Sequence, residues 1–515
     1  MANADSSVVG CHMNRSNILL SVLLLAVLSA SACSGPKAGT VCLACSIGDG
    51  TIAVTMVADT LPANPSLLTF QITISSITFT PASGSPTTIN LSPALTVDLM
   101  RLQSDTVFLG TFSKIPAGQY NSVTLTISNS NITFLNDTNT TLSSCPASTI
   151  CPLSVAAGNP AAPFSFAVSQ NGVTGVGIDL NYANTVTISG STVAANFSNN
   201  NVLSAFTLPR AGSNLAAGQL DLIEDFTGVV SLGNPAVTIT SSTATGRGAL
   251  TATAAANTVL DASPSGTLCA SPTQGQLATC VASNQAASMD VILKSDGTLA
   301  VQEIEPLLAT LQDTVEGIVV GVNSGNQTQF TIIVTDLIPA SQNSLIGSLS
   351  IGSGLTVNIP NPNPFLVDTK GLQVQNNFGG NFSSFFGQTN TSAIHLGQTV
   401  AVHVTAFTAA VGNTIASSTS DTVTLRWSRF TATTSTNSSP AFSITGFPSF
   451  FNASGTGQVQ SFLGTQGANG VTNLEGVPTT TNLIVNNPVA IRALFIENPG
   501  DTLVPAFFAA KVRQH

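Results

Sequence analysis

Charged residues are scarce in this chain. Asp, Glu, Lys and Arg together make up 7% of its 515 residues, against about 25% in ordinary soluble domains, so Ser, Thr, Asn and Gln must supply its solubility. The 23 acidic residues outnumber the 13 Lys and Arg, which gives a net charge of -10. Such a surface offers no basic patch to a phosphate backbone. We therefore expect no nucleic-acid partner and no electrostatic attraction to an anionic membrane.

Catalytic and cofactor motifs are also missing. The sequence contains no G-x-S-x-G, no H-E-x-x-H, no P-loop and no G-x-G-x-x-G after an expected strand. Past residue 12 the only histidines are His395, His403 and His515. His395 and His403 could form a metal or acid–base pair, but no neighbouring carboxylate cluster accompanies them, which favours two structural histidines. The sequence thus predicts no catalytic residue, no metal site and no cofactor.

The N-terminus has the pattern of a secretory signal peptide. After Met13, an alternative start, Arg15 precedes an apolar run over residues 18–28, and the small residues Ala-Ser-Ala at 30–32 supply a cleavage site. The apolar run is too short for a permanent transmembrane helix. We expect residues 1–32 to be removed on export.

Two fates of the new N-terminus are compatible with this pattern. The Ala-Ser-Ala sequence satisfies ordinary signal peptidase, which would release a soluble protein. Alternatively Cys33 is lipidated, because a Cys directly after small residues, followed by a polar tether over residues 33–48, resembles a bacterial lipobox. We favour a lipoprotein that is anchored to the membrane of the cell envelope through Cys33. In known lipoproteins a Ser such as Ser34 after the Cys favours the outer membrane, if the host is Gram-negative.

Six further cysteines remain in the exported chain, and they occur as three close pairs. An even number in an oxidising compartment predicts local disulfides. The first pair also has the C-x-x-C spacing of redox and zinc sites, but a strand is expected after it and a suitable second pair of ligands is missing. We therefore predict disulfides between Cys42 and Cys45, Cys145 and Cys151, and Cys269 and Cys280.

Apolar residues alternate with Thr, Ser, Asn and Gln in short runs bounded by Gly, Pro and Asn. This period of two is typical of half-buried strands, and no long helical stripe interrupts it. Within the run from Phe70 to Phe79 the alternation changes phase at Ser75-Ser76, which predicts a β-bulge. Similar runs cover residues 97–99, 123–127, 164–166 and 186–188. The fold class we predict is all-β, built from antiparallel sandwiches or barrels.

The first domain resembles a known family. Its most specific element is Ile115-Pro116-Ala117-Gly118-Gln119-Tyr120, which leads into the strand at 123–127, and residues 96–102 (Thr-Val-Asp-Leu-Met-Arg-Leu) also fit. These segments are similar to the domain of unknown function 4382 (DUF4382) of bacterial surface lipoproteins. The resemblance covers residues 49–210 and implies an exported antiparallel β-sandwich with no established activity.

The rest of the chain contains a weak internal repeat. Each unit opens with a strand such as Phe226-Thr227-Gly228-Val229-Val230 or Val315-Glu316-Gly317-Ile318-Val319, and each ends in a hairpin, the first of which turns at Asp296-Gly297. The units resemble the small β-barrel modules of the domain of unknown function 5666 (DUF5666) family. We predict three such modules after the sandwich, at residues 218–308, 313–426 and 427–513.

Aromatic residues gather in an insertion of the second module, residues 376–387. Exposed aromatics on a loop can bind sugars or a partner protein. Alternatively they fold back over the barrel as a lid, which we favour for an isolated chain. The same alternatives apply to the Phe447, Phe450 and Phe451 group, while Trp427 is expected to pack. The possible ligand-contact residues of the loop are Phe378, Phe382, Phe385 and Phe386.

Asp221, Glu224 and Asp225 form the densest group of carboxylates. Glycoside hydrolysis needs only two facing carboxyl groups, but the position of this group between the sandwich and the first module favours a solvated linker. We therefore expect a non-catalytic lipoprotein of the cell envelope that has a structural role or binds a glycan or an envelope protein. A carbohydrate-active hydrolase is the alternative, and it requires a cleft with two carboxylates, one of them with a raised pKa.

Overall fold

Strands make up almost all of the regular structure, which confirms the all-β prediction. The computed structural model describes residues 48–58, 66–233, 236–242, 245–254, 258–261, 281–307, 312–323, 325–340, 343–370, 372, 381–451, 455–464, 470–496 and 506–514. Within these ranges the helical elements are short turns: η1 (Arg101–Gln103), α2 (Tyr182–Thr185), η4 (Asn381–Ser384), η5 (Thr391–Ala393), η6 (Ser449–Phe451) and η7 (Thr480–Asn482). None of the helices described is long and apolar enough to cross a membrane.

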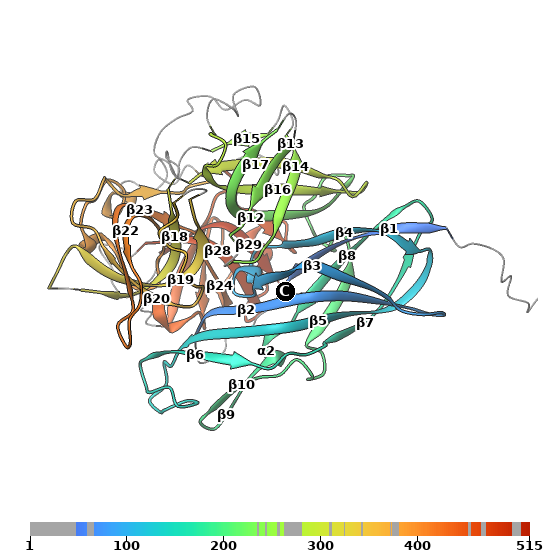
Figure 1. Cartoon of the computed structure of the whole chain (residues 1–515), viewed down its shortest axis with the longest axis horizontal. Helices are drawn as coiled ribbons and strands as arrows, with labels where there is room; N and C mark the ends of the chain where they lie inside the picture. The colour runs from blue at the N-terminus through green and yellow to red at the C-terminus, as the bar shows by residue number, and fades with distance from the viewer. Residues whose placement is uncertain are drawn as a thin grey trace, which may run out of the picture. The chain divides into compact units, whose positions relative to one another are not determined.

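The first domain is a β-sandwich (Figure 1). One sheet has the strand order β11 (Leu203–Thr207), β8 (Val173–Leu180), β1 (Asp49–Val57) and β4 (Val107–Pro116). The other runs β3 (Thr87–Asp98), β2 (Ser66–Pro81), β5 (Gly118–Leu135) and β6 (Ile150–Val155), and β7 (Ala161–Val168) also pairs with β5. A separate hairpin joins β9 (Val186–Ser189) and β10 (Thr192–Ala195). The sandwich is not purely antiparallel as expected, because β1 pairs with β8 in parallel.

The long strand β2 shows how the sequence pattern fixes the sandwich. Phe70, Ile72 and Ile74 are buried in its first half, whereas Ile77 and Phe79 are buried in its second half. Its pairing with both β3 and β5 shifts register between Ile74 and Ser76. A bulge therefore keeps the apolar side chains on the core face on both sides of the phase change, as predicted.

The segment that best carries the family resemblance is a corner between the two sheets. Tyr120 is buried near the start of β5, and its hydroxyl donates a hydrogen bond of 2.8 Å to the carbonyl oxygen of Pro116. Gly118 has a φ of +154° between them. A buried Tyr that bonds back to the preceding turn is the tyrosine corner of Greek-key sandwiches. It fixes the angle at which β4 passes into β5.

The rest of the chain forms three sheets of six strands, which we name modules 1, 2 and 3. Module 1 has β12 (Gln219–Leu232), β13 (Ala236–Thr240), β14 (Ala249–Thr253), β15 (Val259–Leu260), β16 (Ala286–Lys294) and β17 (Leu299–Pro306). Module 2 has β18 (Thr314–Val322), β19 (Gln329–Ile338), β20 (Gly354–Asn358), β21 (Leu366–Val367), β22 (Thr399–Thr408) and β23 (Ala416–Arg426). Module 3 has β24 (Ser428–Thr436), β25 (Ala441–Thr445), β26 (Thr456–Ser461), β27 (Asn473–Glu475), β28 (Pro488–Ile496) and β29 (Ala506–Gln514).

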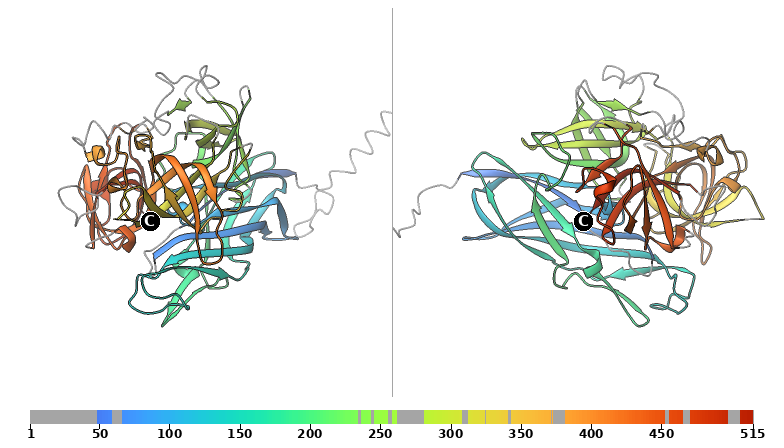
Figure 2. Two further views of the ribbon diagram at one scale, coloured as in Figure 1. Left: turned by 60° about the vertical axis from the view of Figure 1, so that its left-hand side comes forward. Right: turned by 180° about the vertical axis from the view of Figure 1, so that it is seen from behind.

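The three modules share one topology. Figure 2 shows their strands, coloured from green to red along the chain, from two further sides. If the strands of a module are numbered one to six, their order in the sheet is 3-2-1-5-6-4, and an additional parallel pairing joins strands three and six. That pairing closes strands one, two, three, six and five into a small five-stranded Greek-key barrel, the architecture of OB folds. Strands five and six are the closing hairpin expected from the sequence.

Glycine explains why the first strand of modules 1 and 2 can bend into a barrel. A Cβ atom on Gly228 would lie 2.4 Å from the carbonyl oxygen of Thr240, and one on Gly317 would lie 2.5 Å from that of Ile333. Both glycines stand at the same position of the repeat, and Ala432 takes that position in module 3. Only the smallest side chains fit where neighbouring strands approach this closely.

Apolar contacts extend across the borders of these units. The core of module 1 includes Ala53 and Leu208 of the sandwich, and the core of module 2 includes Phe462, Leu494 and Phe508 of module 3. Residues 48–515 accordingly form one compact unit. The contacts mean that the modules are fixed against their neighbours rather than strung on flexible linkers.

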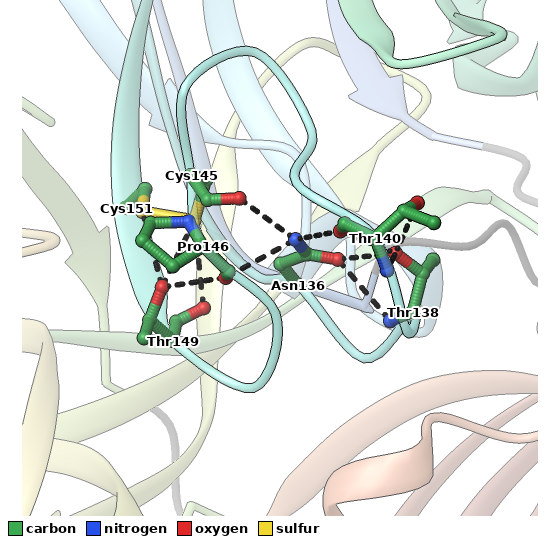
Figure 3. Close-up of a disulfide and its surroundings, with 7 residues drawn as sticks. All are labelled: Asn136, Thr138, Thr140, Cys145, Pro146, Thr149 and Cys151. Atoms are coloured by element: carbon green, nitrogen blue, oxygen red, sulfur yellow. Dashed lines mark hydrogen bonds between the residues drawn. A yellow bond between two sulfur atoms is a disulfide. The ribbon is translucent and has the colours of Figure 1, made fainter.

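One of the three predicted disulfides lies within the described residues, and it is formed. Cys145 and Cys151 are bonded across a loop between β5 and β6 (Figure 3). The amide nitrogen of Asn136 donates to the carbonyl oxygens of Thr140, Cys145 and Pro146, which ties the same loop from inside. The predicted pairs Cys42 with Cys45 and Cys269 with Cys280 lie outside the described residues.

Replacing Cys145 and Cys151 by Ala should lower the free energy of unfolding by about 2 kcal/mol. The two cysteines are six residues apart, and without the disulfide this short loop gains conformational entropy in the unfolded chain. Urea denaturation of the double variant and of the unmodified protein measures this. A variant as stable as the oxidised protein would contradict the prediction.

Candidate functional site: a buried charge cluster beside a cavity

Many of the few charged residues of this protein lie in its interior. Eight of its 13 Lys and Arg residues are joined to nine carboxylates in one continuous network of ion pairs, which we call the charge cluster. The sandwich and all three modules contribute. The basic members are Arg101, Arg247, Lys370, Arg426, Arg429, Arg492, Lys511 and Arg513, and the acidic members are Asp105, Glu224, Asp225, Asp290, Glu305, Glu316, Asp336, Asp368 and Glu475.

Asp225 of module 1 is the centre of the charge cluster. Its carboxylate, which is fully buried, lies 2.9 Å from Arg101 of the sandwich and 2.9 Å from Arg426 of module 2, and it also pairs with Arg429 of module 3. Burial alone would raise the pKa of Asp225, but these three guanidinium groups outweigh it and hold that pKa well below its usual value. One negative charge thus joins three other parts of the chain.

A bulge in β12 places Asp225 there. The pairing of β12 with β16 shifts register between Ile223 and Phe226, and Asp225 has a φ of +54°. This left-handed conformation costs energy for a residue with a side chain. The backbone nitrogen of Asp225 donates to Asp290 at 2.7 Å, and Ser288 donates to the Asp225 carboxylate at 2.5 Å. These bonds and the three ion pairs hold the strained residue in place.

The charge cluster continues from Asp225 in two directions. On one side Arg101 also contacts Glu316 at 3.3 Å and Asp336 at 3.1 Å, both from module 2. On the other side Arg492 of module 3 contacts Glu224 at 3.2 Å, next to Asp225 in sequence. Every module therefore pairs with a charge from another part of the chain, which fixes their mutual positions as well as the apolar contacts do.

Equivalent positions of the repeat carry opposite charges in modules 1 and 3. On the closing hairpin of module 1, Asp290 lies directly opposite Glu303. On the closing hairpin of module 3, the same two positions are Arg492 and Lys511. Like charges directly opposite each other destabilise a hairpin on its own, so each hairpin needs opposite charges from elsewhere in the chain.

A cavity of about 930 Å³ lies beside the charge cluster. Its wall includes residues of the sandwich, of modules 1 and 3 and of the segment after β21. Asp290 and Glu303 line it together with Arg492, and so do Lys370 and Phe462. A volume of this size is within the range of sites for small ligands, and the charged side chains on the wall would favour a polar or charged ligand.

Three carboxyl groups on this wall, those of Asp221, Glu224 and Glu303, have a pKa raised by burial. Burial raises the pKa of Asp221 to about 6, although Thr55 donates a hydrogen bond of 2.6 Å to its carboxylate. Burial also raises the pKa of Glu303 well above its usual value, against the attraction of Lys370 and with added repulsion from Glu305 and Asp290. The cavity therefore contains three acidic groups that protonate more readily than exposed ones.

The wall also borders a group of carboxylates that resembles a metal site. Oxygens of Asp261, Glu305 and Asp368 lie within 4.8 Å of one another. Lys370 contacts Glu305 at 2.8 Å, however, and Arg426 pairs with Asp368. Because ammonium and guanidinium groups already supply the positive charge there, we assign no metal to this group.

The expectation of a solvated linker around Asp221, Glu224 and Asp225 was wrong. Glu224 and Asp225 are 5% and 1% exposed within β12, and Asp221 borders the cavity. The error arose because acidic residues between two domains usually face water, whereas here Arg and Lys from other modules neutralise them. The sequence did contain a signal for this arrangement. In a chain with so few charges, Asp290, Arg492 and Lys511 stand inside otherwise apolar strands.

The histidines do not come together. His403 is buried in β22, and its Nδ1 lies 2.5 Å from the carboxylate of Asp421 on β23. A satisfied strand histidine was the favoured interpretation and is confirmed, but its carboxylate partner was missed, because the two strands pair with His403 opposite Thr422, next to Asp421. His395 lies outside the strand, where its backbone nitrogen bonds to Gln398.

The aromatic residues of the loop in module 2 divide into buried and exposed ones. Phe385 is fully buried against Phe365, with ring centres 5.3 Å apart, whereas Phe386 is 44% exposed. Phe378 and the side chain of Phe382 lie outside the described residues. The packing interpretation thus holds for Phe385, and Phe386 remains available for contact.

The other aromatic candidates pack. Trp427 is buried, and its indole nitrogen donates to Asp368 at 3.1 Å. Phe447 and Phe451 are buried in the core of module 3, and Phe450 is packed against it. Figure 1 shows this module as the strands β24, β28 and β29 at the red end of the colour scale. The turn at Asp296-Gly297, with a Gly297 φ of +79°, joins β16 to β17 as predicted.

Comparison with known proteins supports the resemblance of the first domain. A family described as "Domain of unknown function (DUF4382)" matches residues 50–195. This range covers most of the sandwich and none of the three modules. No curated protein matches the chain.

Substituting Asp225 by Asn should lower the free energy of unfolding by about 3 to 5 kcal/mol, because three guanidinium groups lose their shared buried counter-charge. Urea denaturation at pH 7 measures it. Asp49→Asn, which changes an exposed carboxylate, is the control and should stay within about 0.5 kcal/mol of the unmodified protein.

The effect of Asp225→Asn on the free energy of unfolding should depend on pH. The folded-state pKa of Asp225 is depressed, so its contribution is complete above the unfolded-state pKa of about 3.9 and is lost as the pH falls through the folded-state value. The difference in stability between Asp225→Asn and the unmodified protein should therefore shrink as the pH is lowered below about 4. A difference that stays constant down to the acid transition would disprove the assignment.

Proposed function

We propose that this protein is an exported lipoprotein of the cell envelope that binds a small ligand without transforming it. The lipobox-like sequence that ends in Cys33 supports the anchoring. The cavity of about 930 Å³ between charged walls supports the binding and is the observation on which this role rests. We also propose that the three modules are related to the DUF5666 family, because one barrel topology recurs in all three.

A binding role fits the state of the charged groups around the cavity. Arg492 pairs with Glu224, Arg513 with Glu475 and Lys370 with Asp290. Groups held in mutual ion pairs are poor nucleophiles and poor proton carriers, but they form a preorganised wall. Stable ion pairs therefore favour recognition over chemistry at this site.

Cys33→Ser tests the anchoring. In the unmodified protein, intact-mass analysis of the native membrane fraction should find a diacyl or triacyl adduct at the mature N-terminus, and the variant should lose both the adduct and its membrane association. Asp49→Asn is the control, because it changes an exposed side chain and leaves both the lipidation signal and the Cys145–Cys151 disulfide intact. An unmodified N-terminus in the soluble fraction would mean ordinary secretion.

A carbohydrate-active hydrolase is the second candidate, and one observation favours it. Asp221 and Glu303 border the same cavity, and both have a raised pKa. Two carboxyl groups with different proton affinities are the minimum equipment for glycoside hydrolysis. A hydrolase of this kind requires a cleft with two carboxylates, one of them with a raised pKa, and these two residues meet that requirement.

Chromogenic glycosides distinguish the two functions. We expect no hydrolysis by the unmodified protein between pH 4 and pH 8. Turnover that falls more than about 100-fold in both Asp221→Asn and Glu303→Gln, but not in Asp49→Asn, would establish the hydrolase instead, since both carboxyl groups are needed in that reaction.

A further inference from the structure

Glu303 differs from the other buried carboxylates around the cavity. It is 8% exposed and lines the cavity, yet within the described part of the chain its carboxyl group makes no hydrogen bond and no ion pair. Its neighbours Asp290 and Glu305 both contact Lys370, at 3.0 Å and 2.8 Å. The Glu303 carboxyl group is thus available to pair with a ligand that enters the cavity.

The surroundings of Glu303 contain an excess of negative charge. Asp290 stands opposite it on β16, Glu305 is two residues further on β17, and Asp261 follows β15, which also pairs with β17. Lys370, from the segment after β21, is the cation whose attraction Glu303 feels. From the other elements, Arg426 of β23 lies 3.6 Å from Glu305, and Arg492 of β28 lines the same cavity. Both already pair with other carboxylates. Glu303 therefore faces more negative than positive charge.

A buried carboxylate without a partner is unstable. It either takes up a proton or acquires a cation. Burial raises the pKa of Glu303 well above its usual value, which favours the protonated form when no cation is bound. A cation that enters the cavity would instead pair with the ionised Glu303 carboxylate.

Lys370 shows what kind of cation fits. It belongs to module 2, but its ammonium group reaches into module 1 and lies within 3.0 Å of two carboxylates there. It is fully buried in this position, and its neighbours raise its pKa well above the usual value. The acidic end of module 1 therefore already accommodates one primary ammonium group, and Glu303 offers a place for another.

We propose that the cavity binds a small organic amine, whose primary ammonium group pairs with the Glu303 carboxylate beside Lys370. This inference rests on the proposed binding function and names its ligand class. The volume of about 930 Å³ is ample for a linear polyamine. Phe206, Leu372 and Phe462 on the wall provide apolar contacts for its methylene groups, and Gln302 provides an amide.

Binding of the amine must release a proton. The ammonium ion enters with its charge, the Glu303 carboxyl group gives its proton to solvent, and the ion pair replaces the O–H group. Affinity for the amine should consequently rise with pH as long as Glu303 is protonated in the free protein.

Isothermal titration calorimetry of the mature, exported protein with spermidine tests the proposal. Titrations in two buffers of different ionisation enthalpy measure the protons released. We expect binding with net proton release and an affinity that rises at least about tenfold between pH 5 and pH 8. Absence of binding, or binding without proton release, would overturn the proposal without any variant.

Glu303→Gln locates the site. We expect it to weaken spermidine binding at least about tenfold and to abolish the proton release, whereas Asp49→Asn should change neither. Equal affinity in Glu303→Gln and the unmodified protein would overturn the assignment. If a neutral sugar such as maltotriose binds and spermidine does not, the amine proposal fails while the binding function stands. The anchoring is tested separately, because an unmodified Cys33 would contradict the lipoprotein proposal whatever the binding experiments show.

Discussion

The structure depends on one buried carboxylate. Asp225 must remain ionised among Arg101, Arg426 and Arg429, which come from three different parts of the chain. Buried ion pairs contribute little net stability, because desolvation offsets most of the attraction, but an unpaired buried charge is very costly. Any arrangement of the modules that separates Asp225 from its partners is therefore penalised strongly. Specificity of assembly, more than stability, is what the charge cluster contributes.

The charge cluster accounts for most of the Lys and Arg residues of this sequence. The five Lys and Arg residues outside the charge cluster are Arg15, Lys37, Lys114, Arg210 and Lys294, and the first two lie outside the described residues. Within the described residues, positive charge outside the charge cluster is thus left to Lys114, Arg210 and Lys294.

The sequence predicted the strands better than the contacts between them. Alternation of apolar and polar residues is a local property, so the all-β class, the bulge in β2 and the closing hairpins followed from it. The charge cluster joins residues up to 387 positions apart, such as Arg492 and Asp105, and no local pattern specifies such partners. The carboxylates near Asp225 were expected in water for that reason. The parallel pairing of β1 with β8 was missed on the same grounds, because strand order depends on the whole chain.

The opposite charges on the closing hairpins of modules 1 and 3 have a consequence for how such a protein can evolve. A duplicated barrel initially carries the same residues as its parent, and two acidic hairpins would repel each other. Once one copy has Asp290 and Glu303 where another has Arg492 and Lys511, the copies are no longer interchangeable. Each module then fits only one position in the chain, so a chain with its modules exchanged or one of them repeated would not assemble.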